Sequence, residues 1–244
     1  MISPTQADRL RIVLVRTRNP LNIGAAARAM SNFGFRRLRV VNPFEVAFRE
    51  ARSAVGAVEV LAKAEEYKTV AEAVADCAQV IGTTAGRHRE LKHPLRPLNQ
   101  AGELVKKHLL SGPVALLFGS EKVGLSSEDL SHCHWLIHIP TQEAHLSMNL
   151  GQAVAVCLYE LARGATAKRS SKVLKLATAG DAERLTGSLL HALRASGYVK
   201  PGSATSTEDK VRRLIRRLNL QPDDAEVLLG MLRQILWQLT QLEK

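Results

Sequence analysis

Five short apolar segments, each bounded by Gly, Pro or Asn, constrain the fold of this chain most strongly. They span residues 11–16, 38–41, 80–83, 114–118 and 136–139. Their apolar runs are continuous, without the alternation of a half-exposed strand, which is typical of strands covered on both faces. Helical patterns lie between them, at 24–33, after the capping-box pair Thr69 and Glu72, and from Asn99 as a cap to about Leu110. We therefore predict an α/β fold with a parallel sheet.

The composition changes after an apolar helical segment at 149–163. Residues 164–172 are small, polar and basic, with no acidic residue, as is typical of a linker. Further helical patterns follow at 182–196, 207–219 and 223–242. The predicted division is a domain of residues 1–164, a basic linker of 165–181 and a small α-helical extension of 182–244.

The net charge of +11 in 244 residues indicates a polyanionic partner. Such a surplus favours nucleic acid, because bound counterions are released on association. Solubility alone, or attachment to an anionic membrane surface, remains as an alternative. Aromatic residues make up only 4%, so a platform for stacking bases is not expected. The amino terminus lacks a signal-peptide pattern and no run approaches ~18 apolar residues, so we expect a cytoplasmic protein without a membrane partner.

Three segments at the carboxyl ends of predicted strands carry the candidate site residues, where ligands bind in open α/β sheets. The first passes from a turn into a helix, with Asn22 placed to cap the helix and Gly24 to permit close approach. Arg28 follows on this helix among small alanines, which leave its guanidinium without bulky neighbours.

The second and third segments are also loops that follow strands. Gly119 and Gly124 flank the loop after 114–118, and glycines let a ligand touch the backbone. After 136–139 the chain reaches another helix, which Ser147 or Asn149 can cap. Together these loops can hold an adenosine. The dinucleotide fingerprint GxGxxG is missing, which disfavours a dehydrogenase.

In this order and spacing the segments resemble the three motifs of the SPOUT methyltransferases of the SpoU or TrmH type. The motif Asn-x-Gly-x-x-x-Arg is matched by Asn22, Gly24 and Arg28; Gly-x-Glu-x-x-Gly-Leu by Gly119, Glu121, Gly124 and Leu125; and Ser-x-Asn-x-x-x-Ala by Ser147, Asn149 and Ala153. The resemblance covers residues 8–163. Within the family, segments 11–43 and 82–85 look closest to the TrmJ-like tRNA ribose methyltransferases.

The resemblance implies a homodimer whose domain ends in a deep trefoil knot, with S-adenosylmethionine bound in the knot. The residues it implies for cofactor binding are Thr83, Thr84, Ala85, Gly119, Ser120, Glu121, Gly124, Ile139, Ser147, Met148 and Leu150. This sequence departs from the commonest family form in having Lys122 after Glu121, and Gly86 after Ala85. Both departures concern the local geometry of the loops.

The implied reaction is transfer of the sulfonium methyl group to a ribose 2′-oxygen, and no metal is required. The implied catalytic residues are Arg28, Asn22, Glu121, Ser147 and Asn149. A guanidinium with a pKa above 12 is a poor general base at neutral pH. We therefore expect Arg28 to stabilise the developing alkoxide and to grip the adjacent phosphate, working across a dimer interface.

Basic residues outside these motifs are candidates for RNA contact. The loop 86–97 is rich in charge and ends in prolines, so an exposed loop is expected, and with it contact of Arg87, Arg89 and Lys92 with RNA. A flexible solvated loop is the alternative. Arg16 is a further candidate. A stripe of arginines also lies on one face of a predicted helix, at Arg212, Arg213, Arg216 and Arg217. This stripe is either a solvated face whose charges are neutralised by nearby acids or a surface that follows the phosphates of RNA.

Two other patterns are set aside. His132, Cys133, His134 and His138 invite a zinc interpretation, but on a strand Cys133 would point away from the three histidines. His145 beside Ser147 lacks the nucleophile elbow of a hydrolase. The cysteines Cys77, Cys133 and Cys157 are scattered and are interpreted as buried small hydrophobes.

The sequence thus predicts a tRNA 2′-O-methyltransferase that acts in the anticodon loop, with no DNA partner. Two alternatives stay open: the same reaction on ribosomal RNA, and a knotted RNA-binding protein that has lost catalysis. The intact motif residues argue against the second.

Overall fold

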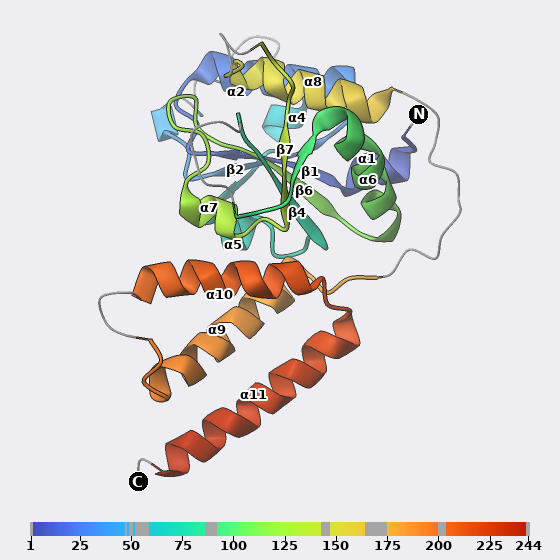
Figure 1. Ribbon diagram of the computed structural model, residues 1–244. Coiled ribbons are helices and arrows are strands. Elements are labelled where there is room, and N and C mark those ends of the chain that lie inside the picture. The colour runs from blue at the N-terminus through green and yellow to red at the C-terminus, as the bar shows by residue number, and fades with distance from the viewer. Residues whose placement is uncertain are drawn as a thin grey trace.

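The computed structural model describes residues 2–46, 48, 51, 59–85, 92–142, 147–163, 175–199 and 204–242. In this part of the chain seven strands form one sheet in the order β3-β2-β1-β6-β4-β7-β5, and all six pairs of neighbours are parallel (Figure 1). The strands are β1 (Leu10–Val15), β2 (Arg37–Val41), β3 (Glu65–Tyr67), β4 (Gln79–Thr83), β5 (Leu95–Pro97), β6 (Val114–Phe118) and β7 (Trp135–His138). The predicted parallel α/β fold is confirmed.

Helices cover both faces of the sheet. They are α1 (Pro4–Arg9), α2 (Pro20–Asn32), α4 (Glu59–Ala62), α5 (Val70–Ala73), α6 (Leu98–Ser111), α7 (Ser127–Ser131) and α8 (Leu150–Ala162). On β1, Ile12 and Leu14 pack into the apolar cluster beneath α2 and α8, whereas Val13 and Val15 pack into the cluster beneath α5 and α7. A strand buried on both sides explains why its sequence is continuously apolar.

The two short edge strands β3 and β5 were missed by the sequence pattern. Glu65 and Glu66 make β3 polar, and β5 ends at Pro97. The prediction of an exposed loop over 86–97 is wrong for Leu95–Pro97, which pairs with β7. An edge position tolerates a proline because only one side of the strand needs a hydrogen-bonding partner.

Two predicted helix caps are also wrong. Asn19, not Asn22, caps α2, and its side chain accepts a hydrogen bond from the Leu21 N–H at 2.9 Å. Helix α6 starts after Pro97 without a side-chain cap, so Asn99 lies inside it. The Thr69–Glu72 capping box does form, on α5. The extra turn at the start of α2 frees the Asn22 side chain for other contacts.

The carboxyl-terminal helices α9 (Ala179–Ala195), α10 (Ala204–Leu218) and α11 (Pro222–Leu242) pack around an apolar cluster of Leu185, Ile215, Ala225 and Leu229. We call residues 175–199 and 204–242 the helical extension. Helix α9 begins within the predicted linker, because Thr178 and Asp181 form a capping box. Its first turn is tied to the sheet domain, where the Ala179 N–H donates to the Cys77 carbonyl at 2.7 Å. Figure 1 shows α10 directly beneath α7.

The chain from β7 to α8 includes residues 143–146, which lie outside the described ranges, as does most of the predicted linker. Threading of the predicted knot therefore stays a prediction. Among the described helices, none is long and apolar enough to cross a membrane.

Candidate active site

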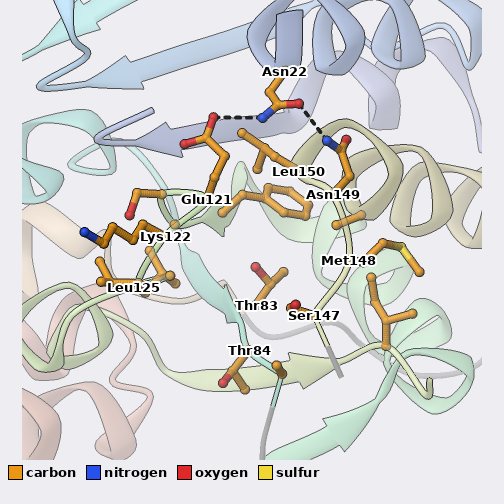
Figure 2. A pocket seen from close by; sticks show the side chains of 18 of the residues that line it. Asn22, Thr83, Thr84, Glu121, Lys122, Leu125, Ser147, Met148, Asn149 and Leu150 are labelled. Atoms are coloured by element: carbon orange, nitrogen blue, oxygen red, sulfur yellow. Dashed lines mark hydrogen bonds between the residues drawn. The ribbon is translucent and has the colours of Figure 1, made fainter. Parts of the chain in front are cut away.

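A cavity of about 710 Å³ lies at the carboxyl ends of β4, β6 and β7. This volume is within the range of pockets that bind small molecules. The walls come from the ends of these strands and the chain that follows them, together with Asn22, Leu130 and the start of α8 (Figure 2). Segments that are far apart in sequence thus meet at one edge of the sheet, as predicted from their positions after strands.

The loop after β6 has a conformation that requires its glycines. A Cβ on Gly119 would lie 2.0 Å from the Gly124 carbonyl carbon, so no side chain fits there. Gly124 has a φ of +68°, and its N–H donates to the Ser120 carbonyl at 2.8 Å to close the turn. Backbone groups of this loop are therefore open to a ligand in the cavity.

Three side chains, one from each motif, form a chain of hydrogen bonds across the rim (Figure 2). The Asn149 amide donates from Nδ2 to Asn22 Oδ1 at 2.7 Å, and Asn22 Nδ2 donates to Glu121 Oε1 at 3.0 Å. Asn149 Oδ1 in turn accepts from the Gly151 N–H as the cap of α8. Because each amide has a donor on one side and an acceptor on the other, the orientation of both is fixed. Thr83 and Ser147 lie across the cavity from this chain.

Glu121 is held as a carboxylate. Burial favours its neutral form, but hydrogen bonds from Asn22 and from the backbone N–H groups of Arg18 and Asn19 outweigh burial, so the pKa of Glu121 is lowered. The two backbone bonds measure 3.3 Å each. Glu121 therefore ties the loop after β6 to the start of α2 and is poorly suited to donate a proton at neutral pH.

The predicted catalytic Arg28 does not line this cavity. Asn22 lies on the buried side of α2, whereas the Arg28 side chain is exposed to solvent on the same helix. Its neighbours Ala26, Ala27 and Ala29 are buried, as their small size allows. Within one chain, the structure thus separates Arg28 from the other predicted catalytic residues.

Every residue predicted to bind the cofactor lines the cavity. The sequence missed the largely apolar part of the wall, formed by Phe118, Val123, Leu130, Ile137 and Thr141, with Lys122 at the rim. Phe118 and Ile137 could have been found, because they lie in predicted strands. Leu130 carries no local signal, since it reaches the cavity only through the placement of α7.

Arg16, predicted to bind RNA, is occupied by an acidic partner. Its guanidinium contacts both carboxylate oxygens of Asp129, one at 3.0 Å, and this hydrogen bonding raises the Arg16 pKa. Lys92 is exposed, and Arg87 and Arg89 lie outside the described residues. Arg16 is therefore a link between the ends of β1 and α7 rather than a free cation.

The predicted basic stripe on α10 is split by the packing. Arg212 and Arg216 are buried against Glu183 of α9, whereas Arg217 is exposed and Arg213 partly so. The expectation that all four share a solvent-facing or phosphate-tracking face is wrong for the buried pair. The sequence contains the acid that counters these charges, but only the packing of α9 on α10 brings Glu183 to the two arginines.

Two of the histidines that were set aside as zinc ligands, His132 and His134, are buried in the protein. His134 Nδ1 accepts a hydrogen bond from the Val80 N–H at 3.0 Å, and burial lowers the pKa of His134 to about 3. Burial, together with Arg212, lowers the pKa of His132 to about 4. Cys77, Cys133 and Cys157 are buried thiols, as predicted, and burial raises the pKa of each.

The fold and the cavity define an α/β protein that can bind a small molecule at the carboxyl edge of its sheet, and comparison with known proteins identifies the family. The model of the SpoU rRNA Methylase family matches residues 9–159. The chain belongs to this family. The predicted resemblance is thereby confirmed, together with the enzyme class, RNA methyltransferase, and with S-adenosylmethionine as the methyl donor.

Individual relatives match almost the whole chain. The tRNA (cytidine/uridine-2′-O-)-methyltransferase TrmJ of Cronobacter sakazakii is 33% identical over 93% of this chain and 96% of its own, and TrmJ of Escherichia coli K12 is 35% identical over 93% and 95%. The crystal structure of TrmJ from Z. mobilis ZM4 is 34% identical, covers 92% of this chain and 98% of its own, and superposes with a TM-score of 0.81. The similarity therefore includes the helical extension.

Proposed function

We propose that this protein transfers a methyl group from S-adenosylmethionine to the 2′-hydroxyl of a cytidine or uridine in tRNA, in the cytoplasm. The observation that carries the proposal is the Asn149–Asn22–Glu121 chain, because it joins all three motifs around one cavity. The names of relatives that match 93% of the chain support tRNA as the substrate. The anticodon loop is the proposed target region.

The residues of the cavity fit the cofactor. Its glycine-containing loop offers backbone donors and acceptors to a neutral adenine, while Phe118, Leu125 and Ile137 offer apolar contact to the ring. When bound, S-adenosylmethionine supplies an electrophilic methyl group on a sulfonium centre. The protein then has to align the ribose oxygen with that methyl group and to stabilise the charge that develops on the oxygen.

We further propose that Arg28 performs this stabilisation in the site of a second copy of the chain. Arg28 is exposed and outside the cavity of its own chain, on a helix that lies beside α8 (Figure 1). The same helices expose large apolar side chains, Leu21 at 78% and Tyr159 at 55%, which suits a face covered by a partner. A homodimer through α2 and α8 would then bring each Arg28 to the partner's cavity.

The remaining cations would extend the grip on RNA. Lys92 at the sheet edge and Arg217 on α10 are exposed and positively charged. We propose that the chain works as a catalytic domain of residues 1–164 followed by a linker of 165–181 and a helical unit that adds phosphate contacts.

Methylation assays test the substrate directly. The purified protein is incubated with labelled S-adenosylmethionine and either total tRNA or ribosomal RNA, and 2′-O-methyl positions are then mapped. We expect label at a pyrimidine ribose of tRNA in the anticodon loop. Label on ribosomal RNA alone would support the rival substrate, and RNA binding without methyl transfer would support the non-catalytic alternative.

Mixed dimers test whether Arg28 acts in the partner's site. One variant is Arg28→Ala, which keeps its cavity; the other is Gly119→Ala, whose new Cβ cannot fit against Gly124. If Arg28 acts across the interface, mixing the two inactive proteins under exchange conditions restores one working site in each mixed dimer. If Arg28 acts within its own chain, the mixture stays inactive. Thermal unfolding of each variant alone checks that both are folded.

A further inference from the structure

Helix α7 lies between the cavity and the helical extension. It follows directly after the loop 119–125, and its residue Leu130 forms part of the cavity wall. The next residue, Ser131, is fully buried and faces the extension, where Arg212 Nη1 donates to Ser131 Oγ at 3.1 Å. Two consecutive residues of one short helix therefore contact the ligand cavity and the extension.

Arg212 is held firmly in this position. Its side chain is 8% exposed, and Nε lies 3.1 Å from both carboxylate oxygens of Glu183. Its Nη2 donates to Glu208 at 2.7 Å. Burial opposes the charge on Glu183, but Arg212 outweighs it and lowers the pKa of Glu183. A guanidinium held by the two carboxylates of Glu183 and Glu208 is a rigid donor for Ser131.

The other end of α7 is also anchored. Asp129 accepts a hydrogen bond from the Ser126 N–H at 2.6 Å in a capping box, and it pairs with Arg16 at the end of β1. A helix of five residues cannot persist on its own, since helix formation has a costly nucleus. The position of α7, and with it Leu130 and the end of the loop 119–125, therefore depends on these tertiary contacts.

We propose that Arg212 is a positioning residue of the cofactor site. It fixes α7 from the side of the helical extension, so the extension contributes to the affinity for S-adenosylmethionine without touching the cavity. The inference rests on the proposed function in one respect, namely that this cavity binds S-adenosylmethionine. It goes beyond that function in making the extension part of the cofactor site even in the absence of RNA.

Arg216 provides the matched control. It is buried on the same helix and shares Glu183 with Arg212, at 3.4 Å. Within the described residues, Arg216 makes no hydrogen bond or ion pair with α7. Arg212→Met and Arg216→Met therefore both remove a charge from the same buried cluster, but only the first removes the contact with Ser131.

The experiment measures S-adenosylmethionine binding to the full-length variants by calorimetry, without RNA. We expect Arg212→Met to weaken binding by about fivefold to tenfold, the loss of one charged hydrogen bond, and Arg216→Met to change it less than about twofold. Unchanged binding by Arg212→Met, or equal weakening by both variants, would overturn the proposal. Thermal unfolding runs in parallel. If Arg212→Met does not fold, Ser131→Ala replaces it; this variant removes the acceptor together with the hydrogen bond that Ser131 Oγ donates to the Glu128 carbonyl within α7.

Hydrogen exchange gives a second readout that needs no cofactor. Amides of 119–131 should exchange faster in Arg212→Met than in Arg216→Met, because α7 has lost its anchor; equal exchange contradicts the proposal. Failure of the proposed function is seen separately, as absence of S-adenosylmethionine binding by the wild-type protein. Wild-type binding with an unaffected Arg212→Met refutes only the positioning role.

Discussion

Helices α2 and α10 both carry arginines that the sequence offers as candidates for contact with RNA, and the structure places them in opposite environments. Arg28 on α2 is exposed, and among the described residues it forms no ion pair. Arg212 and Arg216 on α10 are buried against Glu183. The difference lies in the partner helix, because α9 presents a carboxylate to α10. An arginine that is buried beside a carboxylate becomes part of the structure, whereas one without such a partner stays available to substrate.

Arg28→Ala tests the exposed arginine of α2 and should have the largest effect on the rate of methyl transfer. Methyl transfer should fall about 100- to 1000-fold, as when a group that stabilises developing charge is removed, while the affinity for S-adenosylmethionine stays nearly unchanged. Single-turnover rates and calorimetry measure the two quantities. Arg28→Lys should also be slow, because it loses the planar fork. Loss of cofactor binding in step with rate would show that Arg28 shapes the cavity instead.

Glu183→Gln tests the buried arginines of α10. Removing the carboxylate leaves Arg212 and Arg216 short of countercharge, and we expect a loss of about 3 kcal/mol in the free energy of unfolding. Urea denaturation measures it, with Glu226→Gln on the exposed part of α11 as the matched control. A loss no greater than that of the control would mean that the buried cluster does not stabilise the docking of the extension.

His132 and His134 are buried where the sheet domain meets the helical extension, and they predict how stability depends on pH. The pKa of His132 falls from 6.5 to about 4 and that of His134 to about 3 on folding. Between pH 6.5 and 4 the unfolded chain therefore binds more protons than the folded one, so the free energy of unfolding is highest above pH 6.5 and declines as the pH falls.

From pH 7 to pH 4.5 we expect a decline of about 2.5 kcal/mol from His134 alone. Urea unfolding at a series of pH values measures the slope, and His134→Gln should flatten it. His191→Gln, at an exposed position of α9, should leave the slope unchanged. A slope that His134→Gln does not alter would contradict the assignment.

Asn22→Asp sharpens the comparison within α2, where Asn22 faces the cavity and Arg28 faces solvent. The new carboxylate would face Glu121 in place of the amide that donates at 3.0 Å. Like-charge repulsion should raise the pKa of one of the two acids and reduce kcat/KM by about tenfold at neutral pH. The loss should shrink as the pH is lowered toward the raised pKa. A pH-independent loss would indicate that Asn22 contributes through shape alone.

The cavity was largely predictable because its residues follow apolar strands. The strand pattern is local, and parallel strands bring their carboxyl ends to one edge, so Gly119, Glu121 and Asn149 could be placed together from sequence. The polar edge strand β3 was not predictable, since its stability comes from pairing with β2 rather than from its own residues. Leu130 was missed for a similar reason, because only the anchoring of α7 brings it to the cavity.

The sequence by itself determined the parallel α/β fold, the three motifs and the conformation that Gly119 and Gly124 require, because each depends on residues close together in the chain. Only the tertiary structure decided which arginines are free. Arg212 meets Glu183, 29 residues away, and Arg16 meets Asp129, 113 residues away. Helical periodicity places a charge on a face of its own helix, but the helix that packs there decides whether that charge is buried and paired.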